Sequence, residues 1–177
     1  MASIRPKLGF AIIIVVSALA ARVHAQFTFT TNSGAITIKK YTGPGGNVAI
    51  PSATNGLPVV TIGSGAFWQC FTLLRVTIPD TVTNIGPMAF DHCIGLTNVT
   101  ISQSLRTIGG NAFSYCESLP GVAIPHTVTY IGSSAFDSCY NLASITISSN
   151  VTSIQHGAFV SCFKLTAITV DALNISY

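Results

Sequence analysis

Cysteine is the residue type in this sequence with the widest range of possible chemistry, and it recurs at a fixed interval. Its thiolate can form a disulfide, bind a metal ion or act as a nucleophile. The five cysteines are spaced 23 residues apart: Cys70, Cys93, Cys116, Cys139 and Cys162. Equal spacing in a repeated structure places them in one column, about 5 Å apart, with parallel Cβ vectors that do not supply disulfide geometry. We therefore predict a ladder of buried free thiols that pack as small apolar residues; partial disulfides or a metal site are the alternatives.

Histidine and aspartate could supply acid–base or metal chemistry if the fold brought them together. Counted from the start of each repeat, His92, His126 and His156 fall at different positions and so face different sides. Asp91 and Asp137 share a position, but two repeats put them roughly 10 Å apart, at the far edge of what an inverting glycosidase pair uses. The sequence also lacks a nucleophile elbow and a phosphate loop. We predict a protein that is not an enzyme, with no cofactor and no shared metal site.

The element that must position all these residues is a 23-residue unit repeated five times. Each unit starts at an isoleucine, places Ala-Phe four residues on, and then has a cysteine and a leucine at intervals of three. The units start at Ile62, Ile85, Ile108, Ile131 and Ile154, without a spacing error through Val170. A strict period of this length predicts a solenoid, in which successive coils stack and bury a shared core.

Within one unit, the apolar pattern predicts a strand followed by an outer turn. Val76 and Ile78 alternate with polar residues, which indicates a half-buried strand. A second short strand is expected where Ile85 re-enters the core. Apolar steps of three and four over residues 89–96 favour a helical turn on the outer side. Gly86 and its equivalents are expected to permit a tight corner between the short strand and this turn. The predicted fold class is therefore an α/β repeat solenoid with a parallel β-sheet, short helical turns on the outer side and an N-terminal β-hairpin cap.

The two ends of the array are predicted to differ. Two alternating runs around Asn32-Ser33-Gly34 indicate a hairpin, so residues 26–61 are assigned to a hairpin cap with a degenerate first repeat. Residues 62–170 are the five repeats, the last incomplete, and residues 171–177 an uncapped tail. Asn174 and Tyr177 stand where the repeat calls for apolar residues. We therefore expect an exposed core at this end, and either a fragment of a longer array or self-association through the C-terminal end.

The first 25 residues have the pattern of a secretory signal peptide. Arg5 and Lys7 precede an apolar run, residues 8–20, that is shorter than the ~20 residues of a membrane-spanning helix. Cleavage after Ala25 would give a secreted or cell-surface protein with no stable membrane span; an uncleaved anchor is the alternative. Three of the eight Lys and Arg residues lie in this segment, which leaves five against five Asp and Glu. The mature chain has no excess of positive charge, so nucleic acid is not an expected partner.

Two surfaces are candidates for binding. The outward positions of the predicted strands are polar and lack aromatic residues, and they include Arg75, Thr77, Asn98, Thr100, Ser144, Thr146 and Thr169. The simplest interpretation of the strand face is a β surface that contacts only solvent. A functional interpretation is a weak, extended contact with a protein or glycan. A third interpretation is an ice-binding surface formed by a row of threonines. The outer side carries Trp68, Tyr115 and Tyr140. These form a second candidate patch, unless the rings only cover the phenylalanine column.

The repeat unit Ile-Gly-x-x-Ala-Phe-x-x-Cys-x-x-Leu-x-x-Val-x-Ile-Pro resembles the BspA-like bacterial leucine-rich repeat, in register from Ile62 to Val170. Serines replace the proline at Ser102 and Ser148, and Gln155 replaces the glycine, which affects strand ends and a corner. The resemblance implies an exported or cell-surface protein that binds other macromolecules, often as an adhesin or surface antigen. We expect an extracellular protein or glycan as the partner. The alternative is a structural spacer, part of a longer array without its own ligand.

Overall fold

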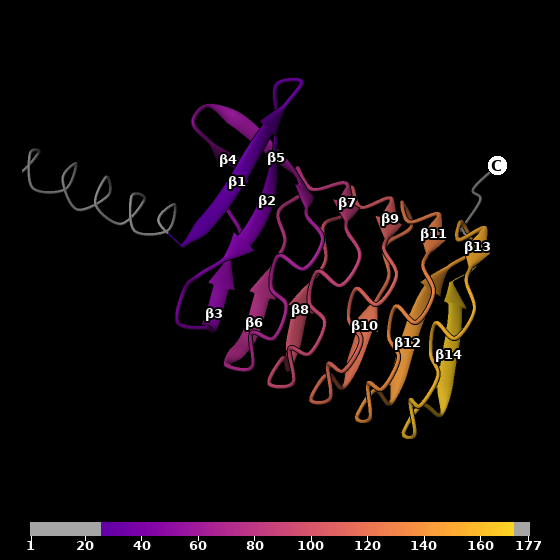
Figure 1. Ribbon diagram of the computed structural model, residues 1–177. Helices are drawn as coiled ribbons and strands as arrows, with labels where there is room; N and C mark the ends of the chain where they lie inside the picture. Colours follow the sequence, from indigo (N-terminus) through magenta and orange to yellow (C-terminus); the bar gives the residue numbers. More distant parts are fainter. Residues whose placement is uncertain (1–25, 172–177) are drawn as a thin grey trace, which may run out of the picture.

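The computed structural model describes residues 26–171, which form a stack of coils with a β-hairpin at its N-terminal end (Figure 1). The predicted signal segment, residues 1–25, and residues 172–177 of the predicted tail lie outside the described residues. Strands β1 (Phe27–Asn32) and β2 (Ala35–Tyr41) pair antiparallel. Between them, Ser33 and Gly34 have φ angles of 49° and 77°, the left-handed backbone that a two-residue hairpin loop requires.

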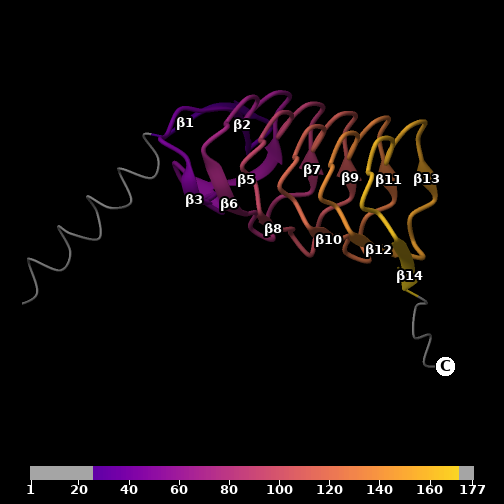
Figure 2. The same cartoon turned by 90° about the horizontal axis from the view of Figure 1, so that it is seen from below.

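Each coil contributes strands to two sides of the stack (Figures 1 and 2). On one side, short parallel strands continue the sheet of the hairpin: β5 (Leu57–Ile62), β7 (Asn84–Ile85), β9 (Thr107–Ile108), β11 (Tyr130–Ile131) and β13 (Ser153–Ile154). The short strand expected at Ile85 is therefore present, as β7. Strand β4 (Ala53–Thr54) pairs antiparallel with β5. The other side carries six strands: β3 (Gly46–Ala49), β6 (Leu73–Thr77), β8 (Asn98–Thr100), β10 (Gly121–Ala123), β12 (Ser144–Ser148) and β14 (Ala167–Asp171).

The longer strands pair in parallel, as predicted, but they are divided between two three-stranded sheets, β3-β6-β8 and β10-β12-β14. The residue just before a strand normally donates its N–H to the preceding coil. Thr97 N donates to Leu74 O, and Ala143 N donates to Pro120 O, both at 2.9 Å. Pro120 occupies this place before β10 and has no N–H. The hydrogen bond to Thr97 is therefore missing, and the sheet is interrupted between β8 and β10.

The predicted helical turns are wrong, because residues 26–171 contain no helix. Each coil instead crosses the outer side in an arc of consecutive turns. Asp91 N donates to Met88 O within its own arc, whereas Phe90 N donates to Ala112 O of the next coil. Met88 and His92 also have left-handed φ angles of 55° and 59°. A helix would need all these N–H groups for bonds within the arc, so the fold is a β-solenoid rather than an α/β array.

A column of stacked phenylalanine rings runs through the centre of the core. Ring centroids of successive coils are 4.8 Å (Phe67–Phe90), 5.1 Å (Phe90–Phe113), 5.2 Å (Phe113–Phe136) and 5.6 Å (Phe136–Phe159) apart. Tyr41 of the hairpin extends the column, with its centroid 5.0 Å from that of Phe67. Each such aromatic pair adds roughly 0.5–1.5 kcal/mol to the burial of its rings, so the stack ties every coil to the next.

The glycine that follows the first isoleucine of most repeats has a different role from the predicted one. Gly109 and Gly132 do not have a left-handed φ, so they are not needed for a special corner conformation. A Cβ atom on Gly132 would instead lie 2.4 Å from Gly110 N of the preceding coil, and one on Gly109 would lie 2.6 Å from Pro87 N. Glycine at this place therefore permits the backbones of neighbouring coils to approach closely.

The two ends of the stack differ in how the core is covered. At the N-terminal end, hairpin residues such as Phe27, Ile36 and Ile38 are buried in the core. In the last arc, the N–H groups of Gly157, Phe159 and Ser161 have no acceptor within residues 26–171. Large apolar side chains of the last coil are also exposed, by about half or more: Ile154 (48%), Phe163 (80%), Ile168 (53%) and Val170 (61%).

Candidate binding surface

Strands β3, β6 and β8 place two rows of outward side chains next to one another. Parallel pairing aligns Arg75 with Asn47 on one side and with Asn98 on the other, which forms the first row. Of the valines that follow these residues, Val48 and Val76 are buried, and Val99 is partly buried against the core. The second row lies two residues further along each strand: Ala49, Thr77 and Thr100. The surface over these strands is therefore polar, although the side beneath it is apolar.

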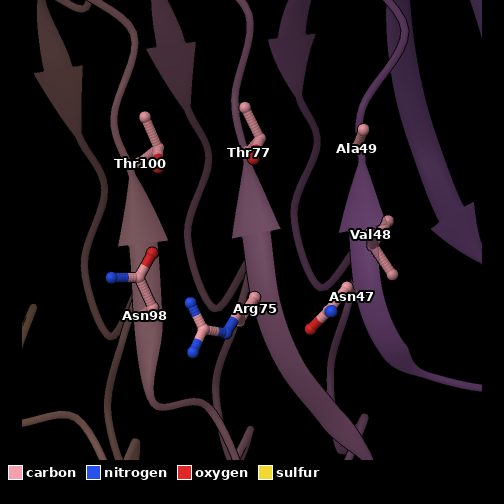
Figure 3. Close-up of a pocket in the computed structure, with 7 residues that line it drawn as sticks. All are labelled: Asn47, Val48, Ala49, Arg75, Thr77, Asn98 and Thr100. Atoms are coloured by element: carbon pink, nitrogen blue, oxygen red, sulfur yellow. The ribbon is translucent and has the colours of Figure 1, made fainter.

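A shallow cavity of about 320 Å³ lies over the two rows. Its lining residues are Asn47, Val48, Ala49, Arg75, Thr77, Asn98 and Thr100. Figure 3 shows the side chains of Asn47, Arg75 and Asn98 next to one another across three strands, with Thr77 and Thr100 in the row beyond them. This volume is at the lower end of the range for small-molecule sites. The cavity can hold one small ligand or one unit of a larger one.

The polar side chains of this cavity are not used by the fold itself. Elsewhere on the coils, Thr97 Oγ1 donates to Leu74 O at 2.9 Å, and Asn141 Nδ2 donates to Glu117 O at 2.7 Å. Such bonds tie one coil to the next. By contrast, no side-chain hydrogen bond within residues 26–171 involves the polar groups of the cavity: Asn47, Arg75, Thr77, Asn98 and Thr100. Their donors and acceptors are available to a ligand.

Arg75 gives the cavity its one positive charge. Within the described part of the chain, its guanidinium has no carboxylate within 4.0 Å. The carboxylate nearest in sequence, Asp80, accepts a hydrogen bond from Gln103 N at 2.7 Å. A guanidinium presents five donors in a planar fork that matches carboxylates and phosphates. The cavity can therefore bind an anionic group.

The structure divides the predicted strand face between two sheets. Arg75, Thr77, Asn98 and Thr100 come together in the cavity. The remaining predicted residues, Ser144, Thr146 and Thr169, lie on β12 and β14 of the second sheet, where Thr146 pairs with Thr169. Gly121 and Ala123 of β10 separate the two groups and carry no polar side chain. The predicted threonine rank is thus interrupted both by Ala123 and by the break in the sheet.

The structure places the three predicted outer aromatic residues in different surroundings. Trp68 is 54% exposed and lines a separate, apolar cavity with Gly65 and Met88. Tyr115 stacks on His92, with ring centroids 4.3 Å apart. Tyr140 stacks on Phe163 at 5.6 Å. No ring contact within residues 26–171 joins the three to each other, so the structure does not bring them into one stacked cluster.

The cysteines lie in one column beside the phenylalanine rings, with free thiols. Each thiol from the second coil onward donates to the carbonyl oxygen of the phenylalanine in the preceding coil: Cys93 to Phe67 (3.2 Å), Cys116 to Phe90 (3.3 Å), Cys139 to Phe113 (3.1 Å) and Cys162 to Phe136 (3.1 Å). Burial raises the pKa of the Cys116 thiol well above its usual value. Cys70 and Cys162, at the two ends, are only partly buried. The inner thiols therefore stay protonated and contribute to packing, not to nucleophilic chemistry.

The histidines and acidic residues do not form a metal centre in the described residues. No group of three or more His, Cys, Asp or Glu side chains there has the geometry to hold a metal ion. His92 is paired with Asp91 and stacked on Tyr115. These two local contacts account for the position of the His92 ring.

The sequence analysis missed three residues of the cavity: Asn47, Val48 and Ala49. They belong to the degenerate first coil, where Val48-Ala49-Ile50-Pro51 matches Val76-Thr77-Ile78-Pro79. That match already placed Asn47 at the position of Arg75. The sequence therefore contained the alignment of Asn47 with Arg75. The spacing between this coil and the next is irregular, however, and this obscured which residues of the two strands lie side by side.

Comparisons with known proteins agree on the type of repeat. A family model for the BspA type leucine-rich repeat region matches residues 60–176 in six copies. No curated protein sequence matches this chain significantly. Among the described residues, no helix is long and apolar enough to span a membrane.

Solved structures of bacterial repeat proteins are similar to this chain. A T. pallidum leucine-rich repeat protein is 30% identical, with a TM-score of 0.66, over 82% of this chain and 79% of that one. A leucine-rich cell surface protein from Faecalibacterium prausnitzii is also 30% identical, with a TM-score of 0.73, over 82% of this chain but only 38% of its own length. A Bacteroides ovatus leucine-rich repeat protein is 28% identical, with a TM-score of 0.57, over 81% and 45% of the two chains.

Proposed function

This chain belongs to the BspA-type leucine-rich repeat family, and on this basis we propose that it is an exported, non-catalytic module that binds an extracellular protein or glycan. The observation that carries the proposal is the cavity over β3, β6 and β8, whose polar side chains have no partner within residues 26–171. The similar F. prausnitzii structure is that of a cell surface protein, which agrees with a location outside the cell.

Export is proposed from residues 1–25, which have a charged start, an apolar run and small residues before Gln26. Intact-mass measurement of protein recovered from the culture medium and from the cell surface tests this. We expect a species that begins at Gln26. A species that retains Met1 and sediments with membranes would mean that the segment is an anchor.

Binding is tested by incubating the purified protein with immobilised extracellular proteins and with a glycan array, and measuring whether binding saturates. We expect the double variant Asn47→Ala/Asn98→Ala to bind more weakly, because it removes two amide groups from the cavity. Asn32→Ala is the matched control, since Asn32 carries an amide but is exposed on the hairpin strand β1, away from the cavity. Equal loss in both variants would argue against the cavity as the binding site.

A second candidate function is that of a structural spacer, and the open face of the last coil favours it. The N–H groups of Gly157, Phe159 and Ser161, which have no acceptor within residues 26–171, form together with exposed apolar side chains a surface on which another coil or another copy could stack. Self-association through this end without saturable binding to any extracellular ligand would support the spacer over the binding module.

A further inference from the structure

We propose that the cavity over β3, β6 and β8 recognises a carboxylated sugar, with Arg75 as the anchor for the carboxylate. This inference rests on the proposed binding function and names the ligand class for the same site. The carboxylate would meet the planar fork of the Arg75 guanidinium in a bidentate contact. Asn47 and Asn98, aligned with Arg75 on the two neighbouring strands, would bind the sugar ring on either side of this contact.

The number of charges in the cavity argues for a ligand with one anionic group per unit. Arg75 is the one cationic side chain among the seven lining residues, and none of the seven is acidic. Nucleic acids and polyphosphates are bound by several cations that neutralise successive phosphates, and the cavity does not provide them. A single carboxylate matches a single guanidinium that has no carboxylate partner within residues 26–171.

The other polar groups argue for a sugar in place of an acidic peptide side chain. The amides of Asn47 and Asn98 and the hydroxyls of Thr77 and Thr100 can each donate and accept hydrogen bonds. Sugar hydroxyls have the same dual character, so each can pair with a group of this kind. An acidic side chain offers acceptors only, and the N–H donors of a peptide lie in its backbone, whereas a sugar carries a donor and an acceptor on each hydroxyl of the ring that bears the carboxylate.

The position of the cavity in the stack implies one such site in the described chain. In the later coils, the positions equivalent to Arg75 are Gly121, Ser144 and Ala167, none of them cationic. The break between β8 and β10 also separates the cavity from the second sheet. A longer acidic glycan would therefore be held by one carboxylated unit, while its other units extend into solvent.

Isothermal titration calorimetry with an oligomer of galacturonic acid tests the proposal, and the methyl-esterified oligomer is the matched ligand control. We expect the acidic oligomer to bind and the ester, which keeps the rings but loses the charge, to bind at least about 10-fold more weakly. Binding should also weaken as salt is added, because the site is exposed and the charges are screened.

Variants of the protein locate the contact. Arg75→Gln should weaken binding of the acidic oligomer about 10-fold or more, since it removes a charge-assisted hydrogen bond. Arg75→Lys should recover only part of it, because an ammonium lacks the planar fork. Arg106→Gln is the matched control: Arg106 is also exposed but does not line the cavity. Its affinity should stay within about twofold of the parent.

Several outcomes overturn the proposal, and they separate it from the proposed function. Equal binding of the acid and its ester, or equal affinity of Arg75→Gln and Arg106→Gln, excludes recognition through Arg75. Saturable binding to an extracellular protein with no binding to the acidic oligomer refutes the sugar class, while the binding function stands. Preference for a sulfated over a carboxylated oligomer would assign the cavity to a different anion. Absence of saturable binding to every ligand refutes both proposals.

Discussion

At the scale of single residues, the thiol column shows how a reactive residue type becomes part of the core. Cys93, Cys116 and Cys139 are buried, and each thiol donates to a backbone carbonyl of the preceding coil. Burial is the largest cause of the raised pKa of each thiol, because a thiolate would lose its hydration there. The folded chain therefore holds these thiols in the protonated form.

The raised thiol pKa values predict that the protein loses stability in alkaline solution. In the unfolded chain, cysteine ionises near pH 8.5. Below this pH the thiols are protonated in both states; above it, only the unfolded state releases the proton, so the free energy of unfolding falls as the pH rises. At pH 10 we expect a loss of about 2 kcal/mol for the fully buried Cys116. Denaturant titrations at pH 7 and pH 10 measure it.

Cys116→Ala is the control for this pH dependence, because it removes one ionisable group from the column. Its free energy of unfolding should fall about 2 kcal/mol less between the two pH values than that of the parent. Equal losses in the parent and the variant would contradict the assignment of the effect to Cys116.

At the scale of elements, the spacing between coils depends on glycine. Gly132→Ala should lower the free energy of unfolding by about 1–3 kcal/mol, because its Cβ would overlap the backbone of the preceding coil at Gly110. Gly121→Ala is a milder change, since its nearest contact would be Ser144 O at 3.3 Å. Thermal or denaturant unfolding followed by circular dichroism compares the two. A smaller loss for Gly132→Ala than for Gly121→Ala would contradict the overlap as the cause.

The break between the two three-stranded sheets gives a prediction about one backbone amide. Pro120→Ala adds an N–H where the bond to the preceding coil is missing, and its acceptor would be Thr97 O. The new amide should exchange with deuterium about as slowly as the amides of Thr97 and Ala143, which make the equivalent bonds. NMR-detected hydrogen exchange of the variant measures this. Rapid exchange at position 120 would show that another feature separates the two sheets.

At the scale of the whole molecule, the stack that residues 26–171 form has one covered end and one open end. The hairpin β1-β2 covers the N-terminal face, whereas β14 presents a free edge and the exposed side chains of Ile168 and Val170. Uncovered strand edges of this kind pair with other chains. We therefore propose that self-association proceeds through the C-terminal end.

Sedimentation velocity over a range of concentrations tests that expectation. We expect the parent protein to form larger species as its concentration rises. Ile168→Lys should remain monomeric at concentrations about 10-fold higher, because an edge lysine opposes strand pairing. Thr42→Lys, an exposed change next to the hairpin, is the control and should associate like the parent. A parent protein that stays monomeric at every concentration contradicts association through this end.

The 23-residue period by itself determined the solenoid and the composition of its core. Residues at one place in the repeat must stack on their equivalents in the next coil, since every coil follows the same path. The buried positions of Phe90, Phe113 and Phe136 follow from this rule without any knowledge of local conformation. The hairpin turn at Ser33 and Gly34 was also predictable, because few residues adopt its left-handed backbone.

The tertiary structure decided what the period could not. Apolar steps of three and four suit a helical turn locally. Phe90 N, however, donates to a carbonyl oxygen of the next coil. Because each N–H group used between coils is no longer available for a bond within its own coil, the helix does not form. The alignment of Asn47 with Arg75 depends on the path of an irregular first coil, where the repeat spacing does not apply. Pairing between strands is a long-range choice among backbone partners. Only the assembled stack determines which side chains share a surface.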